Sequence, residues 1–275
     1  LTIQVNTTIS RWNINDIDNL CALMRKLGLT LWAVFFLVPT GRGEEGDQIS
    51  PDQFEKVFNK LYDLQQSGEF DIKTTAAPHY RRVVIERSRI TGRAEDSVRF
   101  VPPDRRSASR SVAPTLDELA EQSRPPRGEK GDVPAWVHPG AWTQGDGIGR
   151  AARGVNDANG FVFIDHIGDV HPSGFMPWAA GNVKKQSLIE IYRNSERFKL
   201  LRDYKQLKGK CRMCEYRDMC GGARSRSFSI TGDPMASEPN CVHVPEKLWG
   251  EKVNWLDPNM LVADMTPYIQ KYGDV

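Results

Sequence analysis

Four cysteines near the C-terminal end of this 275-residue chain constrain its fold more than any other feature. They are Cys211, Cys214, Cys220 and Cys241, in the pattern Cys-x2-Cys-x5-Cys-x20-Cys, and the fifth cysteine, Cys21, lies far from them in the sequence. A short loop with this spacing turns several thiolates toward one centre, as in the sites that bind metal ions or iron–sulfur clusters. The sequence therefore predicts a metal centre with these four residues as ligands.

Two kinds of centre are compatible with four thiolates. A [4Fe-4S] cluster takes one cysteine sulfur per iron, so it uses all four. A structural zinc ion also takes four, but zinc ribbons usually pair two Cys-x2-Cys knuckles, whereas the second half here is Cys-x5-Cys and a remote cysteine. The spacing favours iron and leaves zinc open. Cys21 lies on the apolar face of a predicted helix, and we expect it to be a small core residue.

The cysteines form one group instead of dispersed pairs. The first residues do not have the pattern of a signal peptide, so we expect a reducing compartment, the cytoplasm, and metal binding in preference to disulfides. No apolar run approaches the ~20 residues of a membrane helix, so no membrane partner is predicted. A net charge of only +2 argues against a nucleic-acid partner. The sequence makes no prediction of the oligomeric state.

Residues 1–80 alternate between the patterns of strands and helices. Residues 1–10, 31–38 and 70–75 predict strands, and 31–38 is apolar almost throughout, as in a parallel strand covered on both faces. Between them, residues 14–28 and 50–66 predict helices, the first ended by Gly28 and the second capped by Ser50. This order implies a parallel sheet or part of a barrel. Because the sequence begins within a strand, we expect an N-terminally truncated chain.

Residues 81–154 have a different composition. Nine arginines fall between Arg81 and Arg110, and repeated proline and glycine follow. Such a segment is typical of a solvated insertion or linker, and a basic lip that binds substrate carboxylates is the alternative. The arginines are not regularly interleaved with aromatic residues, so a groove for nucleic acid is not predicted.

Residues 155–245 predict a small domain of mixed structure. Residues 161–172 (FVFIDHIGDVHP) predict a β-hairpin that turns between His166 and Asp169, and residues 188–203 predict one amphipathic helix leading to the cysteines. Residues 246–275 contain Trp249, Trp255 and Tyr268 and predict a helix with a tail.

Several sequence blocks resemble a known family. GFVFIDHIGDVHPSGF, SLIEIYRNSERFKLLRD, GKCRMCEYRDMCGG and EPNC look like a SPASM-type auxiliary iron–sulfur module, which follows the barrel of radical S-adenosylmethionine (SAM) enzymes. QVNTTISRWN, LWAVFFLVPTGRG and IKTTAAPHYRR resemble the later strands of that partial barrel. CGGARSRSF and PSGF resemble the branch of haem and haem d1 biosynthesis more than the peptide-modifying branch. The resemblance covers most of residues 1–80 and 155–245.

The resemblance implies an α/β fold in two parts. Residues 1–80 would be the C-terminal part of a partial (β/α)6 radical SAM barrel, and residues 155–245 a small α+β SPASM-type domain, with 81–154 as the insertion and 246–275 as the tail. The four cysteines would ligate one auxiliary [4Fe-4S] cluster, because Ser173 and Arg224 stand where a further cluster would need cysteines. Full ligation favours electron transfer or a structural role. Arg224 and Arg226 would offset the charge of the cluster or pair with Asp233 and Glu238.

The resemblance also implies contacts to SAM at the carboxyl ends of the barrel strands. Asn6, Thr8 and Ser10 are the candidates, and Arg42 is a candidate for binding a carboxylate. The alternative for the hydroxyl groups is a structural role, in which they form hydrogen bonds with the backbone at the end of the strand. The alternative for Arg42 is an ordinary position in a surface loop. The cluster that binds SAM needs a Cys-x3-Cys-x2-Cys motif, which this sequence lacks, so SAM and a second [4Fe-4S] cluster are expected only in the full-length parent. His79 is a weaker candidate for proton transfer.

The function implied is that of the C-terminal portion of a radical SAM oxidoreductase or lyase. Its partners would be an electron donor and a small-molecule substrate. By analogy with the haem branch the leading candidate is a tetrapyrrole, whose propionates Arg42 and Arg81 would bind. No catalytic residue is assigned. A peptide-modifying radical SAM maturase is one alternative. The other is a non-catalytic iron–sulfur or zinc-binding fragment, which the missing motif favours for this polypeptide. His171 is expected to approach the auxiliary cluster.

Overall fold

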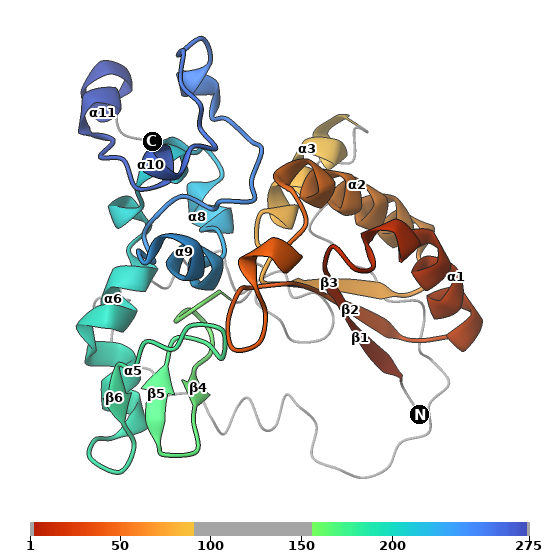
Figure 1. Ribbon diagram of the computed structural model, residues 1–275, viewed down its shortest axis with the longest axis horizontal. Coiled ribbons are helices and arrows are strands. Elements are labelled where there is room, and N and C mark those ends of the chain that lie inside the picture. The colour runs from red at the N-terminus through yellow and green to blue at the C-terminus, as the bar shows by residue number, and fades with distance from the viewer. Residues whose placement is uncertain (1–2, 91–155, 274–275) are drawn as a thin grey trace, which may run out of the picture. The chain divides into compact units, whose positions relative to one another are not determined.

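The N-terminal part of the chain folds into a parallel sheet with helices, in a computed structural model that describes residues 3–90 and 156–273. Strand β1 (Gln4–Ile9) pairs in parallel with β2 (Leu31–Phe36), and β2 pairs in parallel with β3 (Asp71–Thr75). Helices α1 (Ile17–Leu27) and α2 (Pro51–Ser67) connect these strands, and α3 (Tyr80–Ile90) follows β3 (Figure 1). The predicted parallel sheet is confirmed.

The three helices cover one face of the sheet. The strand residues on that face are buried together with the apolar sides of the helices; they include Ile9, Trp32, Val34, Phe36 and Ile72. Cys21 lies in the same core, as predicted, and burial raises the pKa of its thiol. This packing provides the main hydrophobic stabilisation of the N-terminal part.

The opposite face of the sheet is more polar. The register aligns Asn6 of β1 with Ala33 of β2 and Lys73 of β3, and their side chains alternate with those of the core face. Leu31 is only half-buried on this face, so the expectation that β2 is covered on both sides is wrong for part of its length. This face of the sheet therefore offers less apolar surface to packed helices than the opposite face does.

The helix boundaries have local causes. The Ser50 side chain accepts a hydrogen bond from the Gln53 backbone N–H, and the Gln53 side chain accepts one from the Ser50 backbone N–H, which is a complete capping box before Pro51. Gly28 ends α1 with a left-handed φ of +57°. The predicted helix at 14–28 begins as a 3-10 turn, η1 (Ile14–Asp16), before it becomes α1.

Helix α3 lies where the sequence predicted the start of a linker. Tyr80 and Val83 pack into the N-terminal core, and Arg87 forms an ion pair with Asp63 of α2. The boundary after residue 80 is therefore wrong, because the first arginines belong to an ordered helix face. The rest of the predicted insertion, up to residue 154, lies outside the described residues.

The C-terminal part begins with a small antiparallel sheet in the order β4-β5-β6, formed by β4 (Phe163–Ile164), β5 (Asp169–His171) and β6 (Gly181–Asn182). The predicted hairpin is confirmed. The single predicted helix at 188–203 is instead two, α5 (Leu188–Asn194) and α6 (Glu196–Arg202), because Ser195 between them takes an extended backbone with ψ near 131°. Phe198 and Leu201 of α6 pack with Val170 of β5 in a second core.

Short helices follow, and they present the cysteines. In chain order they are η3 (Tyr204–Gln206), α7 (Gly209–Met213), α8 (Arg217–Cys220), α9 (Arg224–Thr231), η4 (Glu246–Leu248), α10 (Pro258–Leu261) and α11 (Thr266–Tyr272), while η2 (Glu45–Asp47) lies earlier, between β2 and α2. The tail packs against α7, since Trp255 and Met265 share a core with Met213. All described residues belong to one compact unit, 1–97 with 153–275, and a second unit, 98–152, falls outside them.

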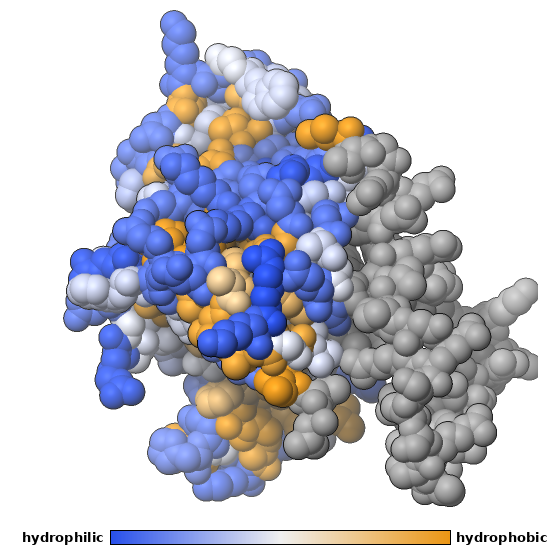
Figure 2. Space-filling model, turned by 90° about the vertical axis from the view of Figure 1, so that its right-hand side faces the viewer, coloured by the Kyte–Doolittle hydropathy of each residue, from blue (hydrophilic) through white to orange (hydrophobic). Residues whose placement is uncertain are grey.

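Hydrophilic residues predominate on the face shown in Figure 2, where hydrophobic side chains form separate small patches. Within residues 3–90 and 156–273, no helix is both long and apolar enough to cross a membrane.

Candidate metal centre

The four cysteines come from two short helices and one loop. Cys211 lies within α7, Cys214 follows the end of α7, Cys220 is the last residue of α8, and Cys241 lies in the loop after α9. Their thiols interact electrostatically. Burial and then the neighbouring Cys241 and Cys211 raise the pKa of Cys220 to about 12, and burial together with Cys211 and Cys220 raises the pKa of Cys214. The four thiols therefore lie near enough to one another to interact electrostatically.

Backbone amides point at two of these sulfurs. The Gly222 N–H donates to Cys220 Sγ at 3.4 Å, and the Glu238 N–H donates to Cys211 Sγ at 3.3 Å. Amide donors of this kind stabilise negative charge on thiolate sulfurs and tune iron–sulfur centres. The donor set, four thiols with amides directed at two of them, suits an iron–sulfur cluster.

Two glycines allow the chain to turn tightly beside Cys220. Gly221 has a φ of +67°, and a Cβ at this position would lie 2.5 Å from Cζ of Tyr204. Gly222 has a φ of +64°, and its Cβ would overlap the guanidinium of Arg224. Both the backbone conformation and the close approach require glycine here.

Replacing Gly221 with alanine should damage the centre, and Gly232 supplies a matched control. Gly232 ends α9 with a φ of +73°, but a Cβ there would meet nothing within 4 Å. Gly232→Ala should therefore cost only the left-handed strain, about 1–2 kcal/mol. Gly221→Ala should cost clearly more and lower the iron content, because Tyr204 must move. Urea unfolding and iron analysis of both variants test this, and equal losses would contradict it.

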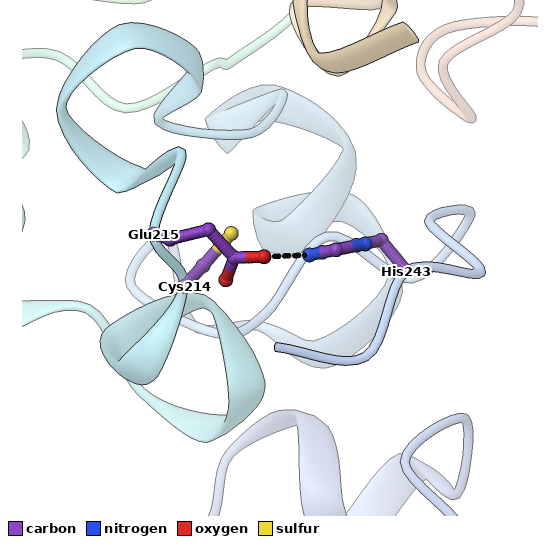
Figure 3. A group of neighbouring side chains, drawn as sticks. All are labelled: Cys214, Glu215 and His243. Atoms are coloured by element: carbon purple, nitrogen blue, oxygen red, sulfur yellow. Dashed lines mark hydrogen bonds and ion pairs between the residues drawn. The ribbon is translucent and has the colours of Figure 1, made fainter. Parts of the chain in front are cut away.

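Two other potential metal ligands, Glu215 and His243, lie near Cys214. The Cys214 sulfur, a Glu215 carboxylate oxygen and a His243 ring nitrogen all lie within 4.8 Å of one another (Figure 3). His243 Nε2 lies 2.8 Å from Glu215 Oε1, so these two side chains already bind each other. Among the described residues, no three cysteine sulfurs lie within the same 4.8 Å of one another. Tetrahedral zinc would place its sulfurs about 3.8 Å apart, given Zn–S bonds of about 2.3 Å.

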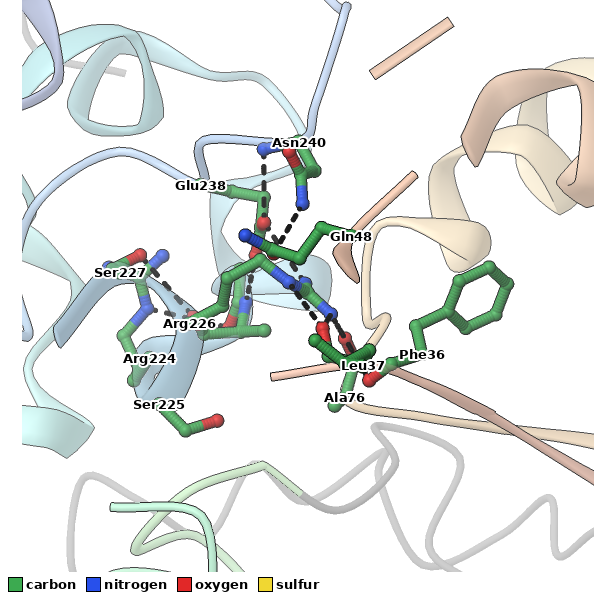
Figure 4. Close-up of polar contacts among 12 residues, drawn as sticks. Phe36, Leu37, Gln48, Ala76, Arg224, Ser225, Arg226, Ser227, Glu238 and Asn240 are labelled. Atoms are coloured by element: carbon green, nitrogen blue, oxygen red, sulfur yellow. Dashed lines mark hydrogen bonds and ion pairs between the residues drawn. The ribbon is translucent and has the colours of Figure 1, made fainter. Parts of the chain in front are cut away.

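A buried arginine joins the C-terminal part to the end of the parallel sheet. Arg226 of α9 is fully buried and forms an ion pair with Glu238, with Nη1 and Oε1 3.1 Å apart. Its Nη2 donates to the carbonyl oxygens of Ala76 at 2.7 Å and Leu37 at 3.3 Å, which follow β3 and β2 (Figure 4). Arg226 therefore occupies carbonyl groups at the carboxyl edge of the sheet.

The α9 arginines bind groups of the C-terminal part, and their expected effect on the charge of a cluster stays a prediction. Arg224 donates to the Pro234 and Ala236 carbonyls at 3.0 and 2.6 Å, so it stabilises the loop before Cys241. The expected pairing of Arg226 with Glu238 is confirmed, whereas Asp233 pairs with Lys208. These arginines serve backbone groups and Glu238.

Other cations lie beside the thiols. Burial and Cys211 raise the pKa of Cys241 to about 11, while Lys210 and Arg82 lower it. Lys210 is almost fully buried and donates from Nζ to the Cys241 carbonyl. Burial has the largest effect on the pKa of Cys220 and raises it, while Arg81 lowers it. Sequence reasoning missed Lys210 as a functional residue, although its place directly before Cys211 was a signal.

The predicted cofactor contacts lie at the sheet. Asn6 and Thr8 are exposed on the face opposite the helices, so the structure brings these two together. Ser10 is buried just after β1, and its hydroxyl accepts a hydrogen bond from the Trp12 N–H at 3.4 Å. Arg42 is exposed in the loop after β2. The geometry leaves Asn6, Thr8 and Arg42 accessible and gives Ser10 a backbone partner.

The two weaker histidine candidates have different surroundings. His79 is buried against the rings of Phe54 and Phe58, with centroids 5.4 and 4.7 Å away. Burial lowers the pKa of His79 to about 3, so the ring is neutral and unsuited to proton transfer near neutral pH. His171 Nε2 lies 3.2 Å from Asp165 Oδ2 within the small antiparallel sheet.

Comparison with known proteins shows relatives named as heme synthases and a pre-heme d1 synthase, and PqqA peptide cyclases that match about a third of the chain or less. Residues 157–215 match the SPASM iron–sulfur cluster-binding domain, a range that includes Cys211 and Cys214. The AdoMet-dependent heme synthase of Methanosarcina barkeri is 33% identical over 244 residues, 89% of this chain and 57% of that protein. The AdoMet-dependent heme synthase of Nitratidesulfovibrio vulgaris is 31% identical over 250 residues, 90% of this chain and 56% of that protein. The pre-heme d1 synthase of Dinoroseobacter shibae is 37% identical over 97 residues, 34% of this chain and 23% of that protein. The chain thus spans a little over half the length of the first two relatives.

Proposed function

This chain is a relative of the radical SAM/SPASM enzymes, near their haem and haem d1 branch, and we propose that it is the C-terminal portion of a radical SAM oxidoreductase or lyase. Its own contribution would be one auxiliary [4Fe-4S] cluster ligated by Cys211, Cys214, Cys220 and Cys241. When bound, such a cluster supplies a one-electron acceptor or donor close to the substrate. The observation that carries the proposal is the match of residues 157–215, which include Cys211 and Cys214, to an iron–sulfur cluster-binding domain, in a fold where all four thiols interact electrostatically.

Two observations support iron–sulfur over zinc. Residues 157–215 match an iron–sulfur cluster-binding domain, and the Cys-x5-Cys spacing of Cys214 and Cys220 differs from the paired Cys-x2-Cys knuckles of zinc ribbons. The amides of Gly222 and Glu238 that are directed at two of the sulfurs are compatible with this assignment. The fifth cysteine, Cys21, is buried in the N-terminal core and is unsuited to a further cluster. We therefore propose a single, fully ligated auxiliary cluster, suited to electron transfer from or to an external donor.

The parallel sheet would be the later part of a partial (β/α)6 barrel, from β1 to β3, with its helix-free face turned inward. Asn6 and Thr8 on that face, with Ser10 at the end of β1, would contact SAM. The Cys-x3-Cys-x2-Cys motif of a SAM-binding cluster is not in this sequence. The proposal therefore places SAM and a second [4Fe-4S] cluster in the full-length parent. Residues 155–245 would be the cluster domain and 246–275 its tail.

The substrate proposed is a tetrapyrrole with propionate side chains. Matches over about nine-tenths of this chain are to proteins named as heme synthases, and this favours the haem branch over a peptide maturase. Arg42 is exposed beside the carboxyl end of β2, where a guanidinium would bind a carboxylate through two parallel hydrogen bonds.

Metal analysis after anaerobic purification tests the proposal. The chain produced as given should contain about four irons and about four sulfides and absorb broadly in the visible range, as expected for one [4Fe-4S] cluster. The full-length protein should contain twice as many. One zinc per chain with no sulfide would refute the iron–sulfur assignment and leave the zinc-binding fragment as the better description.

A further inference from the structure

Arg82 of α3 is a buried cation with an unused donor. It is 5% exposed, its Nη1 donates to Glu86 at 2.6 Å, and its Nη2 bonds to Glu55 of α2. Its Nε, which is also buried, has no hydrogen-bond partner within the part of the chain that the structure describes. A buried N–H donor without an acceptor is unfavourable by about 1–3 kcal/mol, so its presence calls for a reason.

Helix α3 contacts two of the segments that carry the cysteines. Arg81, the neighbour of Arg82, donates from Nη1 to the Met219 carbonyl at 2.8 Å, next to Cys220. One turn further, Glu86 Oε1 lies 3.8 Å from Nδ1 of His243, two residues after Cys241. The first turns of α3 therefore lie against the segments that carry two of the four sulfurs, although α3 belongs to the N-terminal part of the fold.

Glu86 links Arg82 to the same segment. Its Oε2 accepts a hydrogen bond from Arg82 Nη1 at 2.6 Å, and its Oε1 lies 3.8 Å from Nδ1 of His243. The Arg82 guanidinium is therefore held on the side of α3 that faces the cysteine segments.

We propose that Arg82 sets the reduction potential of the centre bound by the four cysteines, by placing a buried positive charge and a free Nε–H near the segments that carry Cys220 and Cys241. A cluster gains negative charge when it takes up an electron, and a nearby cation in a region of low dielectric stabilises the reduced form. Arg82 acts through its charge, as a positioning residue, and the cysteines are the ligands. The inference rests on the proposed function, since it needs a redox centre at this position.

The experiment is an anaerobic redox titration of the auxiliary cluster in the full-length protein, followed by electron paramagnetic resonance. Arg82→Gln should make the cluster about tenfold harder to reduce, which is a shift of 59 mV to more negative potential for a one-electron couple. Arg82→Lys should restore most of the shift, because it returns the charge. Glu55→Gln should move the potential in the opposite direction, because it removes a negative charge next to Arg82.

Arg87→Gln is the matched control. Arg87 lies on the same helix and pairs with Asp63 of α2 at 2.7 Å, so its loss weakens the same α2–α3 packing. It should leave the potential within the error of the titration. A purely structural role for Arg82 would give the same result for Arg82→Gln and Arg87→Gln, and would overturn the inference.

Different results would refute the proposed function and the role of Arg82. Absence of iron and sulfide at this site in the unmodified protein would refute the proposed function. A wild-type cluster whose potential is unchanged in both Arg82→Gln and Glu55→Gln would leave the cluster assignment intact and refute the role of Arg82. If Arg82→Gln does not fold, the Glu55→Gln shift alone decides, since the Glu55 side chain is 28% exposed, more than that of Arg82 at 6%.

Discussion

Replacing Cys211 and Cys241 together with alanine should remove about four irons and about four sulfides per chain. The two residues come from different segments, Cys211 from α7 and Cys241 from the loop after α9. Two thiolates cannot complete four-cysteine ligation of a [4Fe-4S] cluster. Because binding at such a site contributes to folding free energy, the double variant should also unfold at a clearly lower temperature than the wild type.

Cys21→Ala is the control for this experiment. Cys21 is buried, at 2% exposure, but it packs among apolar residues of the N-terminal core. The substitution should leave the iron and sulfide content unchanged and cost only the packing of one sulfur atom. Iron, sulfide and zinc assays with thermal unfolding provide the measurement. Retention of iron in the double variant, or its loss in Cys21→Ala, would show that the ligands are assigned wrongly.

The sequence was sufficient for features that depend on local patterns. Strand-like residue runs predicted β1 and β3, Ser50 as an N-cap predicted the start of α2, and the hairpin of β4 and β5 followed from its turn. The division of residues 188–203 into two helices was missed, because an amphipathic pattern continues across Ser195 although the backbone there is extended. Local periodicity does not report a single residue that leaves the helical conformation.

The surroundings of the candidate site were harder to predict, because they depend on distant residues. Arg82 was assigned to a linker on the basis of arginine content, yet it is buried and forms ion pairs with Glu55 and Glu86. Composition describes a segment as a whole, whereas burial depends on what packs against each residue. The cysteines were predictable because their own spacing specifies the site, whereas the charges around them come from another part of the fold.

Replacing Arg226 with methionine should destabilise the protein by about 3–5 kcal/mol, the cost of breaking one half of a buried ion pair. Arg226 is fully buried and Glu238 is 1% exposed, so the substitution leaves a carboxylate without its counter-charge in a region that water does not reach. It also removes donors from the Leu37 and Ala76 carbonyls at the carboxyl edge of the sheet. Anaerobic urea unfolding measures the loss.

Arg25→Met is the matched control, because Arg25 and Glu69 form an ion pair of 2.6 Å with side chains 46% and 42% exposed. An exposed pair contributes about 0–1 kcal/mol, so this substitution should have little effect. The double variant Arg226→Met/Glu238→Gln should recover part of the stability lost in Arg226→Met, because the uncompensated charge is gone. Equal effects of Arg226→Met and Arg25→Met would contradict the importance of burial.

The same pair predicts how stability depends on pH. Burial alone would raise the pKa of Glu238, but Arg226, His79 and the Ala223 N–H lower it, and the net shift is downward. A carboxyl group with a lowered pKa in the folded state contributes stability that is complete above its usual pKa and is lost as the pH falls through the lower, folded value. Glu238→Gln should therefore be less stable than the wild type near neutral pH, and the difference should shrink in acid. Urea unfolding at several pH values below neutral tests this, and a difference that grows as the pH falls would show that the Arg226–Glu238 pair is not the source of the acid sensitivity.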